Sequence, residues 1–265
     1  MQSALIIHSR HTLEYAKIIS NDYKDVDFLE VQQCNEFILD ISNDKDVVIG
    51  IGGGAVIDSA KILSGNKQCI AIPTTASGAC MTSHAVVWGK TKMSVKTKIP
   101  ILDFRTDMDL KLSQLAIDAT FLDVLCQSLE SLWSVKATKK SKEYAIKSIA
   151  LIDEYITNSN IYTLIEAGNY SGMAIEINGT NIIHAMSYPI TIHYGIEHGI
   201  ACGIVLMYLL DCVDLSDNII SRLYDIDIPP IEDFSVQYII KEAKKYEKFN
   251  EYLNEYIYDN ISNNN

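Results

Sequence analysis

The segment DVVIGIGGGAVIDSAK, residues 46–61, most constrains what this chain can fold into. An apolar run at residues 47–51 enters three consecutive glycines, Gly52, Gly53 and Gly54, and a helical pattern follows. The pattern predicts a buried strand, a turn that needs positive φ, and a helix whose first amides lack partners. The N-terminus of such a helix can bind an anion, and pyrophosphate is the anion that we expect. The spacing is not GxGxxG, and a glycine-rich turn that binds no nucleotide stays open.

The first hundred residues alternate between strand and helix patterns. Strands are predicted at residues 4–7, 26–31, 47–51 and 69–72, and helices at 11–20, 37–41 and 55–63. This alternation is typical of a mostly parallel, doubly wound sheet. Ligands of such sheets bind beyond the carboxyl ends of the strands, where the triple glycine and the threonines after Pro73 both fall.

The chain changes character twice after Pro73. Residues 74–108 read as loop with a hairpin at 85–88 and 93–95, and they carry four lysines that suit either an anion site or a solvated loop: Lys90, Lys92, Lys96 and Lys98. Helical patterns then predict two domains, residues 1–111 and 112–265. The helices are expected near residues 113–132, 142–155, 161–177, 182–186, 199–210, 218–224 and 235–258, with a frayed tail at 263–265.

Composition narrows the classes of partner. The net charge of −12, from 34 acidic and 22 basic residues, opposes binding to nucleic acid or to an anionic membrane. The six cysteines form no CxxC pair and lie mostly in apolar runs, as expected of reduced core thiols in a cytoplasmic protein. No apolar stretch reaches membrane-spanning length, so we expect no membrane segment.

The second half carries side chains that suit a metal. Asp123 and Gln127 share one face of a predicted helix, with Glu130 a further turn along. The segment that follows residue 180 holds three of the six histidines, His184, His193 and His198. Carboxylate and imidazole suit Zn²⁺ or Fe²⁺. Two structural readings stay open, in which His184 is a hydrogen-bonded core residue and His198 caps a helix.

Five motifs occur in an order that resembles the iron-containing alcohol dehydrogenases, members of the dehydroquinate synthase-like superfamily. They are IGIGGGAVIDSAK, IPTTASG, the Asp123 helix with Glu130, HAMSYPI and the EHG at residues 197–199. The resemblance spans about residues 46–206. It implies a Rossmann-like parallel-sheet domain followed by a helical metal-binding domain, with a metal in the cleft between them.

The resemblance also assigns residues by position. The metal positions are Asp123, His184 and His198, with a divalent Fe or Zn expected. NAD or NADP is implied as cofactor, and the residues that would bind it are Gly52, Gly53, Gly54, Asp58, Thr74, Thr75 and Ser77. The sequence does not choose between NAD and NADP, because the residues after the second strand offer no clear carboxylate or arginine.

The chain departs from the family pattern at several places. Gln127 stands where the family has a histidine ligand, and a neutral amide is a weaker donor than imidazole. Tyr188 stands where the family commonly has a histidine, four residues after His184. The chain is also shorter than the usual member of the family. The ESLWSV segment at residues 130–135 and the EYA at 143–145 resemble the phosphonoacetaldehyde reductase-like group.

We therefore expect an NAD(P)-dependent, metal-assisted alcohol dehydrogenase or aldehyde reductase that acts on a small substrate, with an anionic one such as a phosphonate left open. Asp123, His184 and His198 would hold the metal with Gln127 as fourth ligand, and the proton would pass through His193 or Tyr188. Two alternatives are a dehydroquinate synthase-like lyase and a catalytically impaired nucleotide-binding homologue. A homo-oligomer is left open.

Overall fold

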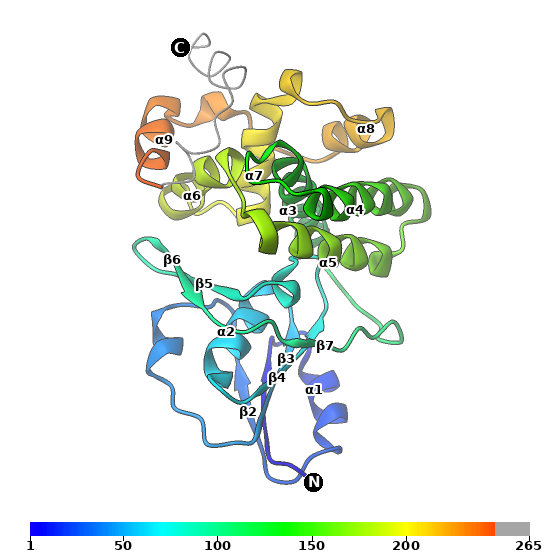
Figure 1. Cartoon of the computed structure of the whole chain (residues 1–265), viewed down its shortest axis with the longest axis vertical. Coiled ribbons are helices and arrows are strands. Elements are labelled where there is room, and N and C mark those ends of the chain that lie inside the picture. The colour runs from blue at the N-terminus through cyan, green and yellow to red at the C-terminus, as the bar shows by residue number, and fades with distance from the viewer. Residues whose placement is uncertain (247–265) are drawn as a thin grey trace. The chain divides into compact units, whose positions relative to one another are not determined.

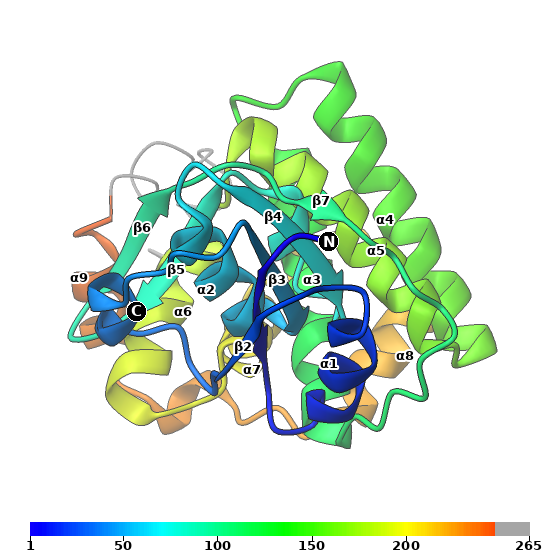
Figure 2. The same ribbon diagram turned by 90° about the horizontal axis from the view of Figure 1, so that it is seen from below.

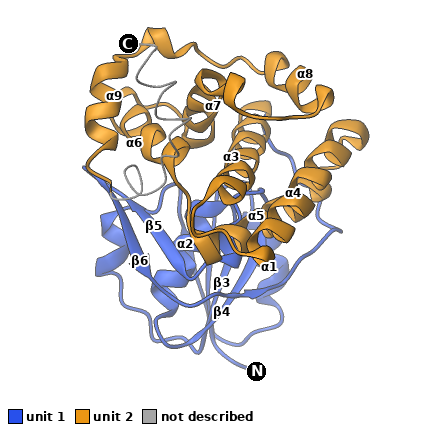
Figure 3. Ribbon diagram, turned by 45° about the horizontal axis from the view of Figure 1, so that its top comes forward, with its two compact units in different colours: residues 1–113 blue, residues 114–265 orange. Residues whose placement is uncertain are grey.

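The computed structural model describes residues 1–246, and these divide between two compact units (Figure 3). Unit 1 is Met1–Ser113, and unit 2 begins at Gln114. Figure 1 shows the order of the elements, with strands and helices in the first unit and only helices in the described part of the second. None of the helices within residues 1–246 combines the length and apolar character that a membrane span requires.

Unit 1 contains a five-stranded parallel sheet in the order β2-β1-β3-β4-β7. Its strands are β1 (Ala4–His8), β2 (Val26–Glu30), β3 (Val47–Gly52), β4 (Gln68–Pro73) and β7 (Ile101–Leu102). The predicted α/β class is confirmed. β7 lacks a sequence prediction because two residues after a proline show no periodicity.

The central strands are covered on both faces, which explains their unbroken apolar runs. Leu5, Ile7 and Val48 pack with α2 (Gly54–Ser64) and the short helix η1 (Glu36–Asp40). The alternate residues, Ile6 and Ile49 among them, pack with α1 (Leu13–Ser20). Because successive side chains of a strand point to opposite faces, α1 and α2 lie on opposite sides of the sheet (Figure 2).

A separate hairpin completes unit 1. Strands β5 (His84–Trp88) and β6 (Lys92–Lys96) pair antiparallel, as the sequence predicts. The short helix η2 (Ala79–Met81) precedes them. The Lys61 ammonium on α2 donates to the carbonyl oxygens of Ala79 at 2.8 Å and His84 at 2.5 Å. One buried side chain thus ties the glycine helix to the start of the hairpin.

Unit 2 is helical and is built around α3 (Gln114–Trp133), most of whose second half is buried. Helix α3 packs against α4 (Lys139–Asn158), α5 (Ile161–Asn178) and α7 (His198–Tyr208). Helix α6 (Ile182–Tyr194) packs against α7 and α9 (Val236–Ala243), while α8 (Asp217–Asp225) packs on α4. Short 3₁₀ turns η3 (Leu210–Cys212) and η4 (Ile231–Asp233) connect the last elements.

Two predicted segments differ from what the structure describes. The helix expected at residues 182–186 runs on to Tyr194 through Pro189. The helix expected at 235–258 is described only as α9, since its end and the predicted tail at 263–265 lie outside the described residues.

Candidate functional site: a glycine turn and a cluster of metal-type ligands

The triple glycine joins β3 to α2, but not through positive φ. Gly53 is the N-cap of α2 with a φ of −81°, and the glycines of positive φ in the described residues are Gly65, Gly78, Gly179 and Gly195. The predicted left-handed turn is therefore wrong. Glycine is needed here because Thr75 packs directly against the turn: a Cβ on Gly53 would lie 2.9 Å from the Thr75 hydroxyl.

The loop after β4 lies directly against this turn. The backbone N–H of Thr74 donates to the carbonyl oxygen of Gly52 at 3.0 Å, and a Cβ on Gly54 would lie 3.2 Å from the Ser77 side chain. The structure thus brings together six of the seven residues assigned to the cofactor: Gly52, Gly53, Gly54, Thr74, Thr75 and Ser77. Helix α2 has no acidic residue in its first turn, so its free amides can face an anion.

The seventh residue, Asp58, faces the interior of unit 1. One carboxylate oxygen lies 2.8 Å from the Lys61 ammonium, and the other accepts from the Val86 N–H at 2.9 Å. Burial raises the pKa of Asp58, while Lys61 acts in the opposite direction. The structure places Asp58 in a buried network that supports the hairpin and does not group it with the glycine turn.

The metal-type side chains of unit 2 converge from three helices. Asp123 on α3, His184 on α6, and His198 with Cys202 on α7 each offer one donor atom, and these atoms lie within 4.8 Å of one another. Asp123 Oδ1 is 3.2 Å from His184 Nε2, and Cys202 Sγ is 3.9 Å from His198 Nε2. An oxygen, two nitrogens and a sulfur at this separation fit a divalent metal such as zinc.

Glu130 sets the orientation of His184. Its fully buried carboxylate accepts from the His184 backbone N–H at 3.1 Å and contacts Nδ1 at 2.6 Å. Each ring nitrogen of His184 thus faces a carboxylate, and a metal bound at Nε2 would leave the remaining proton on Nδ1 with Glu130, which is the arrangement that orients a metal-binding histidine. Burial lowers the pKa of His184, but Glu130 and Asp123 outweigh it and raise that pKa overall.

Asp123 is held as a carboxylate by its neighbours. Burial acts to raise its pKa, but the hydrogen bond from His184, the nearby His198 and a hydrogen bond from Gln127 together lower it. The oxygen of the Gln127 amide does not face Asp123, because it accepts from the Ser171 hydroxyl at 2.7 Å. Gln127 therefore presents its N–H₂ group to Asp123.

The two residues considered for proton transfer lie in different surroundings. Tyr188 is buried and stacks on the His198 ring, with centroids 5.9 Å apart and planes 25° apart. His193 is exposed at the end of α6, where its Nε2 lies 2.5 Å from the Tyr238 hydroxyl. Tyr188 thus adjoins the metal-type cluster, whereas His193 pairs with α9.

Cys202 belongs to the cluster but was not among the residues predicted from the sequence. It follows His198 by four residues, so both side chains share one face of α7. That spacing was the available signal, but a cysteine within an apolar run also reads as core. His198 itself is the first residue of α7 and does not cap it, because the Glu197 side chain accepts from the Gly199 N–H at 2.8 Å.

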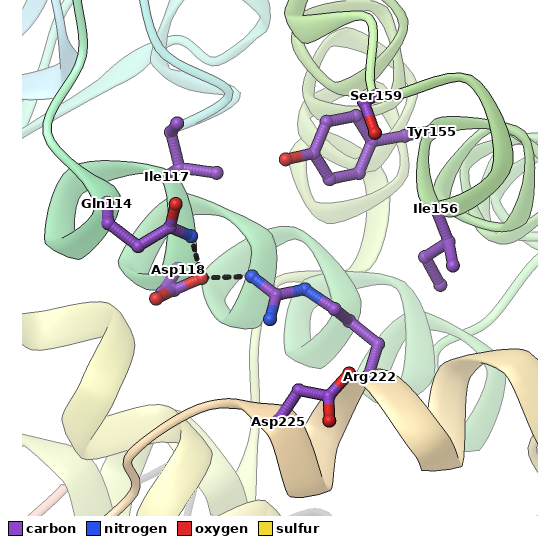
Figure 4. A pocket seen from close by; sticks show the side chains of 8 residues that line it. All are labelled: Gln114, Ile117, Asp118, Tyr155, Ile156, Ser159, Arg222 and Asp225. Atoms are coloured by element: carbon purple, nitrogen blue, oxygen red, sulfur yellow. Dashed lines mark hydrogen bonds and ion pairs between the residues drawn. The ribbon is translucent and has the colours of Figure 1, made fainter.

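A further pocket of about 510 Å³ lies elsewhere in unit 2 (Figure 4). Its floor is an ion pair between Arg222 and Asp118, and Gln114 donates to the same carboxylate at 2.8 Å. None of the predicted site residues lines it. The residues that do are Gln114, Ile117, Asp118, Tyr155, Ile156, Ser159, Arg222 and Asp225.

Comparison with known proteins places both halves of the chain in one family. The profile described as "Iron-containing alcohol dehydrogenase" matches residues 6–110, and that described as "Fe-containing alcohol dehydrogenase family, C-terminal" matches residues 117–226. The chain therefore belongs to the iron-containing alcohol dehydrogenase family, as the motifs predicted.

Named relatives and solved structures agree with this assignment. The phosphonoacetaldehyde reductase of Streptomyces viridochromogenes is 28% identical over 220 residues, covering 64% of this chain and 56% of the relative. A glycerol-1-phosphate dehydrogenase [NAD(P)+] of Methanococcus maripaludis is 30% identical over 194 residues, covering 67% and 56%. The chain thus matches a little over half the length of each relative.

Two solved structures share the fold. The iron-containing alcohol dehydrogenase of Thermotoga maritima superposes with a TM-score of 0.79 at 19% identity, covering 99% of this chain and 90% of that one. The sulfoacetaldehyde reductase of Bifidobacterium kashiwanohense, solved in complex with NAD+, superposes with a TM-score of 0.80 at 17% identity and the same coverage. The predicted fold class is confirmed by these similarities.

Proposed function

We propose that the protein is an NAD(P)-dependent, metal-assisted alcohol dehydrogenase or aldehyde reductase. The observation that carries this proposal is the convergence of Asp123, His184 and His198 in unit 2, with Glu130 holding the ring of His184. A buried histidine between two carboxylates is costly to maintain unless it serves a bound cation or a proton. Family membership supports the same conclusion.

Asp123, His184 and His198 are the residues that would hold the metal. A bound divalent metal would supply Lewis-acid polarisation of a substrate alcohol or carbonyl oxygen. Glu130 orients the ring of His184, and Gln127 donates a hydrogen bond to the Asp123 carboxylate. Tyr188, stacked on His198, is better placed than the exposed His193 to hold a proton near this cluster.

The glycine turn and the following loop would bind the dinucleotide. The first amides of α2 would receive pyrophosphate, and the absence of side chains on Gly53 and Gly54 lets Thr75 and Ser77 lie beside them. The hydroxyls of Thr74, Thr75 and Ser77 offer polar groups to the rest of the cofactor. Hydride chemistry would belong to the nicotinamide.

An anionic aldehyde is the substrate class that we propose. Relatives named for phosphonoacetaldehyde, glycerol-1-phosphate and sulfoacetaldehyde all act on compounds that carry a negative group. The β5–β6 hairpin supplies basic side chains to an otherwise acidic protein. Lys92 lies over the Trp88 ring and Lys96 donates to the Ser83 hydroxyl at 2.7 Å, so two of the four lysines are held in place.

Metal analysis paired with thermal shifts tests the proposal. The purified protein should retain a divalent metal, and NAD⁺ or NADP⁺ should raise its melting temperature, because a ligand that binds only the native state stabilises it. The His184→Ala variant should lose the metal, whereas His193→Ala on the same helix should keep it. Failure of wild-type protein to bind either a metal or a nucleotide would reject the dehydrogenase.

The same preparation separates the two alternatives. A lyase like dehydroquinate synthase would convert a sugar phosphate acid without net change in NAD absorbance, whereas the proposed enzyme oxidises NADH or NADPH as an aldehyde is consumed. A catalytically impaired homologue would show the nucleotide-dependent shift and no turnover of phosphonoacetaldehyde, sulfoacetaldehyde or uncharged aldehydes.

A further inference from the structure

We propose that the Cys202 thiolate, and not Gln127, is the fourth ligand of the metal held by Asp123, His184 and His198. The inference rests on the proposed metal site and deepens it. It assigns a sulfur donor to the centre and so predicts which metal the protein selects.

The spacing of the donor atoms supports this ligand set. Bond lengths of about 2.3 Å to sulfur and 2.1 Å to nitrogen place the two ligands of a tetrahedral zinc about 3.6 Å apart. Cys202 Sγ and His198 Nε2 are 3.9 Å apart. Two ligands at about 2.1 Å, an oxygen and a nitrogen, would be separated by about 3.4 Å, and Asp123 Oδ1 and His184 Nε2 are 3.2 Å apart.

Helix geometry explains why sulfur can reach the centre. His198 begins α7 and Cys202 follows one turn later, so both side chains face α3 and α6 together. Gly199, between them, lies against the backbone of Ala119, one turn before Asp123 on α3. This close approach of the two helices brings the Cys202 and His198 donors within 4.8 Å of the Asp123 carboxylate.

The hydrogen bonds of Gln127 argue against its amide as the fourth ligand. The Gln127 amide oxygen accepts from Ser171, so the group that forms its hydrogen bond with Asp123 is N–H₂, which has no lone pair to donate to a metal. The amide oxygen lies on the Ser171 side, 2.7 Å from the hydroxyl. Turning the amide over would set its oxygen against the Asp123 carboxylate and break the hydrogen bond between the two side chains.

A sulfur ligand changes the expected metal. Thiolate is a soft donor that favours Zn²⁺ over the harder divalent ions, whereas an all-oxygen-and-nitrogen set would accept Fe²⁺ or Zn²⁺. Binding would release the thiol proton of Cys202 to solvent, since a coordinating thiol is deprotonated. Zinc should therefore be the ion that the purified protein retains when both metals are supplied.

Cobalt substitution tests the ligand directly. Co²⁺ added to chelator-treated wild-type protein should produce a sulfur-to-cobalt charge-transfer band in the near ultraviolet. The band should vanish in Cys202→Ser, which should also bind zinc more than about 100-fold more weakly, because loss of a ligand should exceed the 10–100-fold effect of losing an outer-shell partner. Cys69→Ser is the matched control, a buried cysteine of unit 1 that contributes nothing to the cluster, and should keep both the band and the affinity.

Gln127→Ala separates this inference from the proposed function. The variant should keep the cobalt band, because the amide is not a ligand. A band that survives Cys202→Ser, together with loss of zinc binding in Gln127→Ala, would overturn the inference and leave the dehydrogenase proposal standing. Wild-type protein that binds neither Co²⁺ nor Zn²⁺ would overturn both.

X-ray absorption spectroscopy on zinc-loaded wild-type protein tests the same ligand set without depending on whether a variant folds. We expect one sulfur scatterer at about 2.3 Å and nitrogen or oxygen scatterers near 2.0–2.1 Å. A spectrum with only nitrogen and oxygen scatterers would refute the assignment of Cys202.

Discussion

Replacing Lys61 with methionine should strongly destabilise unit 1. The Lys61 ammonium is fully buried, lies 2.8 Å from Asp58 Oδ1, and donates to the carbonyl oxygens of Ala79 and His84. Removing one partner of a buried ion pair costs about 3–5 kcal/mol, because the other charge stays buried. That is a large share of the roughly 5–15 kcal/mol that stabilises a typical domain.

Tryptophan fluorescence can report this loss for unit 1 alone. The chain has two tryptophans, Trp88 on β5 and Trp133 at the end of α3. In a Trp133→Phe background, urea unfolding followed through Trp88 gives the stability of the hairpin and its supports. The deficit of Lys61→Met should grow as the pH rises from about 4, because Asp58, whose pKa burial raises, must then be ionised while buried.

The double variant Asp58→Asn/Lys61→Met decides whether the charge is the cause. Removing both charges should restore part of the stability that Lys61→Met loses, since no unpaired charge then remains buried. If the double variant is as unstable as the sum of the two single variants, the ion pair is not the main contribution and the reasoning is refuted.

Three further predictions follow from the same structure. Glu130→Gln should weaken zinc binding about 10–100-fold by releasing His184, as measured by calorimetry, and unchanged affinity would count against this role. Gly199→Ala should cost about 3 kcal/mol in the urea unfolding followed through Trp133, because its Cβ would meet the Ala119 carbonyl; a wild-type midpoint would contradict that contact. Stability of unit 1 should fall by about 1.5–2 kcal/mol per thiol between pH 8 and pH 10, because the unfolded thiols ionise first, with a pKa of about 8.5. The thiols are Cys34 and Cys69, whose pKa burial raises to about 11, and Cys80, raised to about 12. The same urea midpoint at both pH values would exclude this effect.

The sheet was predictable because parallel strands covered on both faces are continuously apolar. Residues 4–7, 47–51 and 69–72 show this directly, and β1, β3 and β4 form there. Two features of the fold depend on tertiary contacts and could not be predicted from the sequence. The strand β7 is only two residues long, and α6 continues past Pro189 because its remaining turns pack against α7 and α9.

The glycine turn shows how a correct location can rest on a wrong reason. The strand, turn and helix were predicted where they occur, but the glycines were expected to serve positive φ. Their neighbours Thr75 and Ser77 come from another loop, so the steric requirement is invisible in the local sequence. The family resemblance assigned Asp123 and the two histidines to the metal, whereas the position of Cys202 beside them needed the structure, because it depends on how α3, α6 and α7 meet.

The contact of Gly199 with the backbone of Ala119 has a consequence for ion size. Backbone atoms of Gly199 and Ala119, and not flexible side chains, are in contact between α3 and α7. The donor atoms on the two helices therefore have little room to move apart for a larger metal ion. Ca²⁺ needs six to eight oxygen ligands at about 2.3–2.6 Å, which this tight, nitrogen-rich cluster does not offer. Calcium in excess should therefore fail to displace zinc from the cluster.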